Sequence, residues 1–92
     1  MLLKDRVAIV TGAASKRGLG RATAMLFAEH GAKVAILDLD AGAAKEAAAG
    51  LPGGGHIGLA CNVTDREQCL AAVKAVLDTH GRVDVLVNNA GI

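Results

Sequence analysis

Hydrophobic and polar positions follow two different spacings along the chain. Short, almost wholly apolar runs have the length of strands that are covered on both faces. These runs lie at residues 6–11, 33–37, 56–61 and 83–87. The longer stretches between them place apolar residues three and four positions apart, which is typical of helices. These helices are predicted over residues 19–30, residues 41–49 and a segment that begins after Thr64.

The strict alternation of these elements predicts the order βαβαβαβ. Sequential strands joined by helices must run parallel, with right-handed crossovers that place the helices over the sheet. We therefore expect an α/β fold, a doubly wound parallel sheet of the Rossmann type with helices on both faces. Residues 1–92 are interpreted as one domain, because no repeat or linker interrupts the pattern.

The predicted helices carry recognisable start signals. Asp40 is a candidate N-cap for the second helix. Thr64 followed by Glu67 has the spacing of a capping box for the third. The apolar faces are expected to consist of Leu19, Ala22 and Leu26 in the first helix, and of Cys69, Ala72, Val73 and Val76 in the third.

Charge and composition exclude several classes of protein. The chain is 52% hydrophobic, with 10 basic and 9 acidic residues, a single Phe, and no Trp or Tyr. A net charge of +1 and the lack of aromatic platforms argue against nucleic-acid binding. No apolar run approaches the roughly 18 residues of a membrane span, and the N-terminus lacks a signal-peptide pattern. We expect a soluble, cytoplasmic protein without a nucleic-acid or membrane partner.

Cysteine and histidine side chains show no metal-binding or catalytic pattern. Cys61 and Cys69 lack the spacing of a disulfide framework, so we predict two buried small side chains in a reducing compartment. His30, His56 and His80 are scattered near predicted element ends, where solvated or capping roles are expected. The sequence therefore predicts no metal site.

The first strand–helix junction, residues 11–20, is rich in glycine. Gly12, Gly18 and Gly20 let a ligand approach the main chain, and free N–H groups at the start of the next helix favour a pyrophosphate. The position between a buried strand and a helix is the context that a dinucleotide-binding loop requires. The alternative is a tight turn whose glycines serve packing alone.

Asp38 ends the second predicted strand, 18 positions after Gly20. A dinucleotide-binding sheet places the acid that holds the adenosine ribose about 20 residues beyond its glycine loop. A carboxylate there favours a free 2′-hydroxyl and repels a 2′-phosphate, so we expect NAD, with NADP as the less favoured cofactor. The alternative is an ordinary exposed Asp at the start of a helix.

The glycine loop together with Asn88-Asn89-Ala90-Gly91 resembles the short-chain dehydrogenase/reductase family, in particular its 3-oxoacyl-acyl-carrier-protein reductase-like members. The resemblance covers the whole chain. It implies that Asn89, Ala90 and Gly91 lie beside the cofactor and that Asn88 steadies the sheet. A methyltransferase that uses S-adenosylmethionine is one alternative function, and the NNAG motif argues against it.

Three features depart from the pattern of the family. Five residues separate Gly12 from Gly18, which is more than the family commonly has. Asn62 stands before Val63 where the family often has an Asp that meets the adenine; the alternative is a turn-forming Asn. Arg17 occupies a place where relatives that use NADP often have a basic residue, in conflict with Asp38. We expect Asp38 to decide the preference.

The resemblance implies the N-terminal cofactor-binding part of an enzyme that transfers a hydride between NAD(P) and an alcohol or ketone. In the family, the catalytic Ser and the Tyr-x-x-x-Lys pair lie beyond the fourth strand, so we predict no catalytic residue here and a dimer or tetramer for the complete enzyme. A stand-alone nucleotide-binding module is the alternative. The predicted cofactor-binding residues are Gly12, Ser15, Lys16, Arg17, Gly18, Leu19, Gly20, Asp38, Asn62, Val63, Asn89, Ala90 and Gly91.

Overall fold

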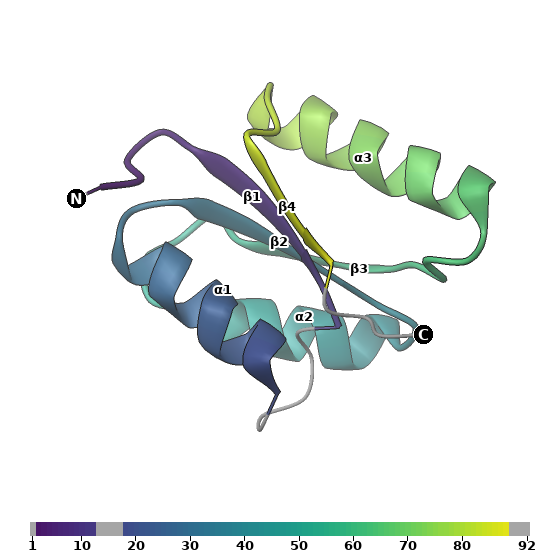
Figure 1. Cartoon of the computed structure of the whole chain (residues 1–92), viewed down its shortest axis with the longest axis horizontal. Helices are drawn as coiled ribbons and strands as arrows, with labels where there is room; N and C mark the ends of the chain where they lie inside the picture. The colour runs from purple at the N-terminus through teal and green to yellow at the C-terminus, as the bar shows by residue number, and fades with distance from the viewer. Residues whose placement is uncertain (1, 13–17, 89–92) are drawn as a thin grey trace.

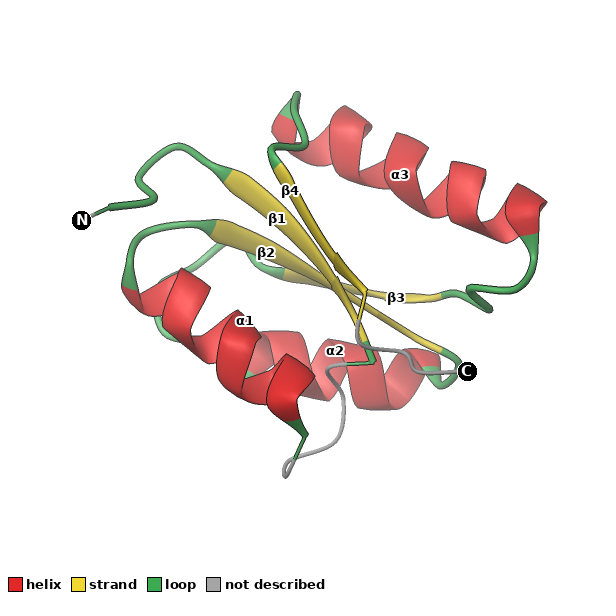
Figure 2. Ribbon diagram, viewed as in Figure 1, coloured by secondary structure: helices red, strands yellow, loops and turns green. Residues whose placement is uncertain are grey.

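The computed structural model describes residues 2–12 and 18–88. Strands and helices alternate through these residues, which confirms the predicted order (Figure 2). The elements are β1 (Val7–Thr11), α1 (Leu19–Glu29), β2 (Lys33–Asp38), α2 (Ala41–Ala49), β3 (Ile57–Ala60), α3 (Arg66–His80) and β4 (Val85–Asn88). None of the described helices is both long enough and apolar enough to cross a membrane.

The strands form one parallel sheet in the order β3-β2-β1-β4. The chain therefore passes from β1 outward through β2 to β3 and then returns to the other side of β1 as β4. Helices α1 and α2 cover one face of the sheet, and α3 covers the opposite face (Figure 1). This is the doubly wound arrangement that the sequence predicts.

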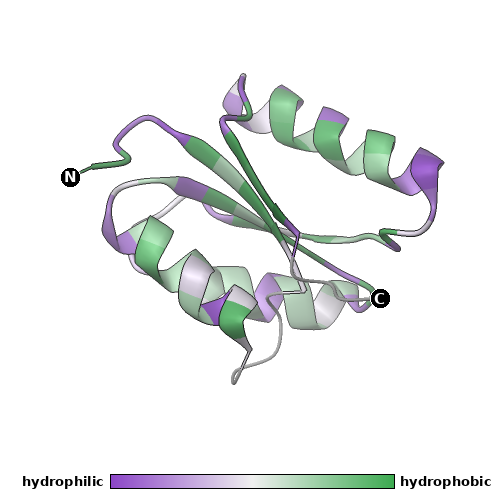
Figure 3. Cartoon of the chain, in the orientation of Figure 1, coloured by the Kyte–Doolittle hydropathy of each residue, from purple (hydrophilic) through white to green (hydrophobic). Residues whose placement is uncertain are grey.

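Two apolar layers, one on each face of the sheet, form the core. Alternate residues of a strand point to opposite faces, so β1 and β2 contribute to both layers. The first layer joins Val10, Val34 and Ile36 to Ala24, Ala28, Ala44, Ala47 and Ala48 of α1 and α2. The second joins Val7, Ile9, Ala35 and Leu37 to Ala72 and Val76 of α3. Figure 3 shows how hydrophobic β1 is along most of its length.

Helix α1 packs on the sheet through its smallest residues. This side of the helix consists of Gly20, Ala24 and Ala28, which are buried. Leu19 is 82% exposed and Leu26 is 51% exposed, and Ala22 is also exposed. The predicted contact face was therefore wrong. Small side chains let a helix lie close to a sheet, and this close approach outweighs the larger apolar area of the two leucines.

Gly58 brings β3 into direct contact with the backbone of α2. A Cβ atom at this position would lie 2.3 Å from the carbonyl carbon and oxygen of Ala44 and 2.4 Å from the backbone nitrogen of Lys45. No side chain fits in that space, since real Cβ atoms do not approach backbone atoms so closely. The alanine-rich helix α2 and this glycine together permit the close packing.

The N-cap of helix α3 lies one residue later than the sequence predicts. Asp65 is the N-cap, and its Oδ1 accepts hydrogen bonds from the N–H groups of Glu67 and Gln68 at 3.0 and 3.2 Å. The capping role predicted for Thr64 is therefore wrong, because the Thr64 hydroxyl donates instead to Oδ1 of Asn62 at 2.7 Å. A carboxylate at this position also interacts favourably with the positive end of the helix dipole.

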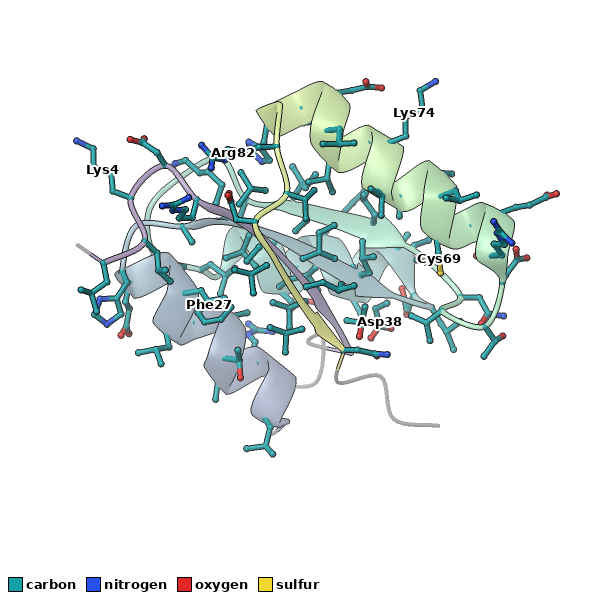
Figure 4. The ribbon with its side chains drawn as sticks, turned by 45° about the horizontal axis from the view of Figure 1, so that its top comes forward. Lys4, Phe27, Asp38, Cys69, Lys74 and Arg82 are labelled. Atoms are coloured by element: carbon teal, nitrogen blue, oxygen red, sulfur yellow. The ribbon has the colours of Figure 1, made fainter. Side chains whose placement is uncertain are left out.

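At the amino end of the sheet, Asp84 ties β4 to β1. Its Oδ2 accepts a hydrogen bond from the backbone N–H of Val7 at 2.9 Å. Arg82 donates to both carboxylate oxygens of Asp84 at 2.8 and 2.6 Å (Figure 4 labels Arg82). Nη1 of Arg6 lies 3.4 Å from Oδ1 of the same carboxylate. The hydrogen bond from Arg82, followed by that from Val7, lowers the pKa of Asp84 to about 2.

His56 has a structural role that the sequence did not predict. Its Nδ1 accepts a hydrogen bond from the backbone N–H of Val34 at 3.0 Å, and its Nε2 lies 2.7 Å from the carbonyl oxygen of Pro52. This pattern requires the tautomer in which Nε2 carries the proton. The ring thus joins the glycine-rich turn after α2 to the start of β2, so the solvated or capping role expected for His56 is wrong.

Candidate dinucleotide-binding site

The carboxyl ends of the four strands meet along one edge of the sheet. The register pairs Asp38 with Ala60, Leu37 with Thr11, and Thr11 with Asn88. The strand order reverses between β1 and β4, so this edge contains the topological switch point where open α/β sheets bind ligands. The segments that follow the four strands therefore all begin at this edge of the sheet.

Thr11 and Asn88 join β1 to β4 at this switch point. The hydroxyl of Thr11 donates to Oδ1 of Asn88 at 2.9 Å and lies 3.5 Å from the carbonyl oxygen of Val87. Asn88 thus braces the sheet, as expected. The next residue, Gly12, has a positive φ of 67° and donates its N–H to the carbonyl oxygen of Leu37 at 3.0 Å. The chain can turn here because glycine tolerates that conformation.

The N-terminus of α1 differs from those of α2 and α3. Gly18 is its N-cap in an extended conformation, and no side chain caps the helix. The first turn contains no acidic residue. The other two helices have their first N–H groups bonded by Asp40 and Asp65. The first N–H groups of α1 therefore lack side-chain partners among the described residues and are suited to an anion.

Asp38 lies at the carboxyl end of β2 and is partly exposed (Figure 4). Its Oδ1 accepts a hydrogen bond from the backbone N–H of Asp40 at 3.1 Å. Asp40 in turn accepts from Ala43 N–H at 3.1 Å, which confirms it as the N-cap of α2. Because Asp40 performs the capping, Asp38 retains a carboxylate oxygen, Oδ2, without a partner among the described residues.

Asn62 and Val63 form the turn between β3 and α3. Oδ1 of Asn62 accepts from both the backbone N–H and the hydroxyl of Thr64 at 3.0 and 2.7 Å. The backbone N–H of Asn62 donates to Oε1 of Gln68 at 2.8 Å. The amide oxygen of Asn62 is thus engaged in the turn, whereas its NH₂ group has no hydrogen-bond partner within the described part of the chain. A contact with an adenine would use that NH₂ group.

The remaining predicted site residues, Ser15, Lys16, Arg17, Asn89, Ala90 and Gly91, lie outside the described residues. The structure brings Gly12, Asp38 and the Asn62–Val63 turn to the carboxyl edge. Gly18, Leu19 and Gly20 are at the N-terminus of α1. Where the chain is described, no group of three His, Cys, Asp or Glu side chains is arranged to hold a metal ion.

Sequence reasoning missed two side chains that shape this edge. The sequence pattern includes Thr11 in the first strand and in the junction that follows it, but it predicts no contact for the Thr11 hydroxyl, although a polar residue at the end of an apolar run is a usable signal. Gln68 holds the turn through Asn62 and also donates from Nε2 to Oδ2 of Asp65 at 3.2 Å. The spacing of Asp65 and Gln68 is that of a capping box and could have indicated Gln68. Its bond to the backbone of Asn62 depends in addition on how α3 lies against the turn.

The known proteins that this chain resembles are dehydrogenases and reductases by name. The short chain dehydrogenase family matches residues 6–92. Over the whole chain, an uncharacterised short-chain type dehydrogenase/reductase of Sinorhizobium fredii is 58% identical, and the chain covers 38% of its length. D-threitol dehydrogenase of Mycolicibacterium smegmatis is 48% identical over 98% of the chain and 35% of the relative. The 3-oxoacyl-acyl-carrier-protein reductase of Thermotoga maritima is 45% identical over the whole chain and 37% of the relative.

The chain thus spans little more than a third of the length of these curated relatives. The family match covers almost every residue, from the start of β1 to the end of the sequence. The parallel sheet, the glycine turn after β1 and the switch point between β1 and β4 agree with that match. The chain belongs to the short-chain dehydrogenase/reductase family.

Proposed function

We propose that this chain is the dinucleotide-binding part of an oxidoreductase that transfers a hydride between NAD and an alcohol or ketone. One observation carries the proposal: the Thr11–Gly12 turn, Asp38 and the turn after β3 leave the sheet from one edge, at its switch point. An elongated ligand placed along that edge would meet these segments in succession. The membership of the family supports the same conclusion.

The residues fit the phosphate part of such a cofactor. Gly12 turns the chain away from β1, and the uncapped N-terminus of α1 offers N–H groups at the positive end of the helix dipole. In this proposal Gly18, Leu19 and Gly20 bind the pyrophosphate through the backbone. In this proposal Ser15, Lys16 and Arg17 belong to the same binding loop.

Asp38 fits the ribose part and favours NAD over NADP. The carboxylate keeps Oδ2 for a ribose hydroxyl, while Oδ1 holds the backbone of Asp40. A 2′-phosphate would meet a negative charge at this place. Arg17 has the opposite preference, since guanidinium groups bind phosphates. We expect Asp38 to determine the preference for NAD over NADP, because its carboxylate lies at the end of the strand itself.

The adenine and nicotinamide parts are assigned to the two outer turns. Asn62 and Val63 follow β3 and are proposed to meet the adenine, with the NH₂ group of Asn62 as the donor. Asn89, Ala90 and Gly91 follow β4 and are proposed to line the cofactor beyond the pyrophosphate. The bound nicotinamide would supply the hydride chemistry, whereas the protein supplies binding and orientation.

This chain has no Tyr, so it lacks the phenolic proton donor that the family uses. We therefore assign cofactor binding to these residues and place the proton transfer in another part of the complete protein. The relatives named D-threitol dehydrogenase and 3-oxoacyl-acyl-carrier-protein reductase support a secondary alcohol or ketone as the substrate. A cytoplasmic homo-oligomer, a dimer or a tetramer, remains part of the proposal.

Binding of NAD to the 92-residue chain, measured by isothermal titration, tests the proposal. Gly18→Val should abolish binding, because the new side chain crowds the backbone where the pyrophosphate approaches. Gly18 has φ −80°, which valine adopts without strain, so the fold should survive. Gly54→Val is the control, since the space around Gly54 is open. Unchanged affinity in Gly18→Val would contradict the phosphate-binding role.

A further inference from the structure

The two cysteines of the chain lie side by side in the folded protein. Cys61 follows β3, and Cys69 lies in the first turns of α3. Their Sγ atoms are 3.9 Å apart, although eight positions separate the residues in the sequence. Both cysteines are free thiols. The fold has therefore brought together two residues that the sequence predicted to be buried small side chains. That burial is confirmed for Cys61 and wrong for Cys69, which is only partly buried.

The two thiols differ in exposure. Cys61 is 2% exposed, whereas Cys69 is only partly buried (Figure 4 labels Cys69). Burial, followed by the hydrogen bond with Cys69, raises the pKa of the Cys61 thiol. Since the thiolate is the attacking form, Cys69 is the thiol that reacts first with an external oxidant.

The hydrogen bonds of the two thiols link them to the turn between them. The Cys61 thiol donates to the sulfur of Cys69. The Cys69 thiol lies 3.5 Å from the carbonyl oxygen of Val63 and 3.9 Å from that of Asn62. The Cys69 thiol thus holds the backbone of the Asn62–Val63 turn, and the Cys61 thiol is bonded to Cys69. Any reaction that removes these protons also removes the hydrogen bonds.

We propose that Cys61 and Cys69 form a reversible intramolecular disulfide, a modification site that closes the β3–α3 turn. The sulfur atoms must approach by about 2 Å more to reach the S–S bond length of ~2.0 Å. A side-chain rotation together with a small movement of the first turn of α3 supplies that distance. No other cysteine is present in the chain to compete for either thiol.

The oxidant is a small disulfide such as glutathione disulfide. The Cys69 thiolate attacks one of its sulfurs, forms a mixed disulfide and releases one glutathione thiolate. The Cys61 thiolate then attacks Sγ of Cys69 and releases the second glutathione. Two thiols of the protein lose two protons and two electrons in total, and glutathione disulfide gains them to become two glutathione molecules.

Closure of this disulfide alters the turn that is proposed to hold the adenine. The carbonyl groups of Asn62 and Val63 lose the Cys69 thiol as a donor, and α3 moves relative to β3. We therefore expect the oxidised chain to bind NAD several-fold more weakly than the reduced chain. This consequence rests on the proposed function, whereas formation of the disulfide does not.

Intact mass spectrometry of the chain after treatment with glutathione disulfide tests the modification. The wild-type chain should lose about 2 Da and retain no free thiol, and dithiothreitol should reverse the change. Cys61→Ala should instead stop at the mixed disulfide on Cys69, about 305 Da heavier than before. Cys69→Ala should stay unmodified, because Cys61 is buried. Circular dichroism checks that both variants fold.

Disulfide-linked dimers, or a stable glutathione adduct on the wild-type chain, would overturn the intramolecular disulfide. Titration of NAD into the oxidised and the reduced chain then tests the consequence. Equal affinity of the two forms would show that the turn tolerates the disulfide and would overturn the effect on binding. If the reduced chain binds no NAD, the proposed function fails, while the mass measurement still decides whether the disulfide forms.

Discussion

The hydroxyl of Thr11 donates to Oδ1 of Asn88 at 2.9 Å, across the two strands that flank the switch point. Thr11 is buried, with 5% of its surface exposed, whereas Asn88 is exposed, so the bond is partly shielded from water. Gly12 and its turn follow Thr11 directly, and the NNAG motif begins with Asn88. One polar contact therefore sets the relative position of the two segments that are proposed to enclose the cofactor.

Thr11→Val should destabilise the chain by about 1 kcal/mol, because the contact between β1 and β4 loses a hydrogen bond whose Thr11 end is buried. Urea denaturation followed by circular dichroism measures the loss. Thr79→Val is the matched control, since its hydroxyl donates to the carbonyl oxygen of Ala75 on the exposed surface of α3. A loss in Thr11→Val no larger than in the control would contradict the structural role of this contact.

Asp38→Ala should weaken the binding of NAD much more than that of NADP. The variant loses the carboxylate proposed to bind the ribose, and about tenfold weaker NAD binding, or ~1.4 kcal/mol, is expected. NADP should bind equally well or better, because the charge that repels its 2′-phosphate is gone. Titration of both cofactors measures the ratio. Asp78→Ala controls for the loss of a carboxylate elsewhere, because Asp78 lies on the exposed surface of α3. Equal losses for both cofactors in Asp38→Ala would contradict the assignment.

Gly58→Ala should destabilise the chain by about 3 kcal/mol or more, or prevent folding, because the added Cβ overlaps the backbone of Ala44. Gly54→Ala provides the comparison, since no atom lies within 4 Å of the Cβ that it adds. That variant should change the free energy of unfolding by less than about 0.5 kcal/mol. Urea midpoints, or the soluble yield where a variant does not fold, distinguish the two. Similar stability of both variants would show that β3 and α2 pack less closely than described.

The ion pair at the amino end of the sheet should make the stability depend on acid pH. The folded pKa of Asp84 is about 2, below its usual 3.8. The stabilisation from this carboxylate is therefore complete above the usual pKa and disappears as the pH falls through the folded pKa, between about pH 4 and pH 2. Asp84→Asn should flatten the dependence of the urea midpoint on pH in this window.

Asp78→Asn is the control for that experiment, because Asp78 has no ion pair with another described residue. It should leave the pH dependence of the wild-type chain unchanged. An Asp84→Asn variant that keeps the full acid-induced loss would mean that other carboxylates are responsible. The prediction concerns the shape of the pH profile, since Arg6 and Arg82 lose their partner in the variant at every pH.

Strand β4 pairs only with β1 among the described strands, and Leu86 on it is 65% exposed. An unpaired strand edge beside an exposed apolar side chain favours association with another chain. The isolated 92-residue chain should therefore self-associate as its concentration rises, and Leu86→Lys should weaken this association. Sedimentation velocity measures it, with Leu39→Lys as the control at another exposed leucine. A monomeric wild-type chain that binds NAD would favour the stand-alone module.

The local sequence was sufficient to predict the order of the elements and the N-cap of α2. Apolar runs of strand length and helical spacings are short-range patterns, and Asp40 caps a helix with N–H groups three residues away. The cap of α3 was misassigned to Thr64 because Asp65, the adjacent residue, is an equally good cap in the sequence. The choice depends on the turn, in which the Thr64 hydroxyl binds Asn62.

The sequence by itself determined the family of this chain, its alternating α/β pattern and the positions of the glycines and the acid that are proposed to bind the cofactor. These properties depend on residues near one another in the chain. The tertiary structure decided which face of α1 is buried, how Thr11 meets Asn88, and that the thiols of Cys61 and Cys69 are adjacent. Each of these contacts joins separate elements, so it is set by the packing of helices against the sheet rather than by any local pattern.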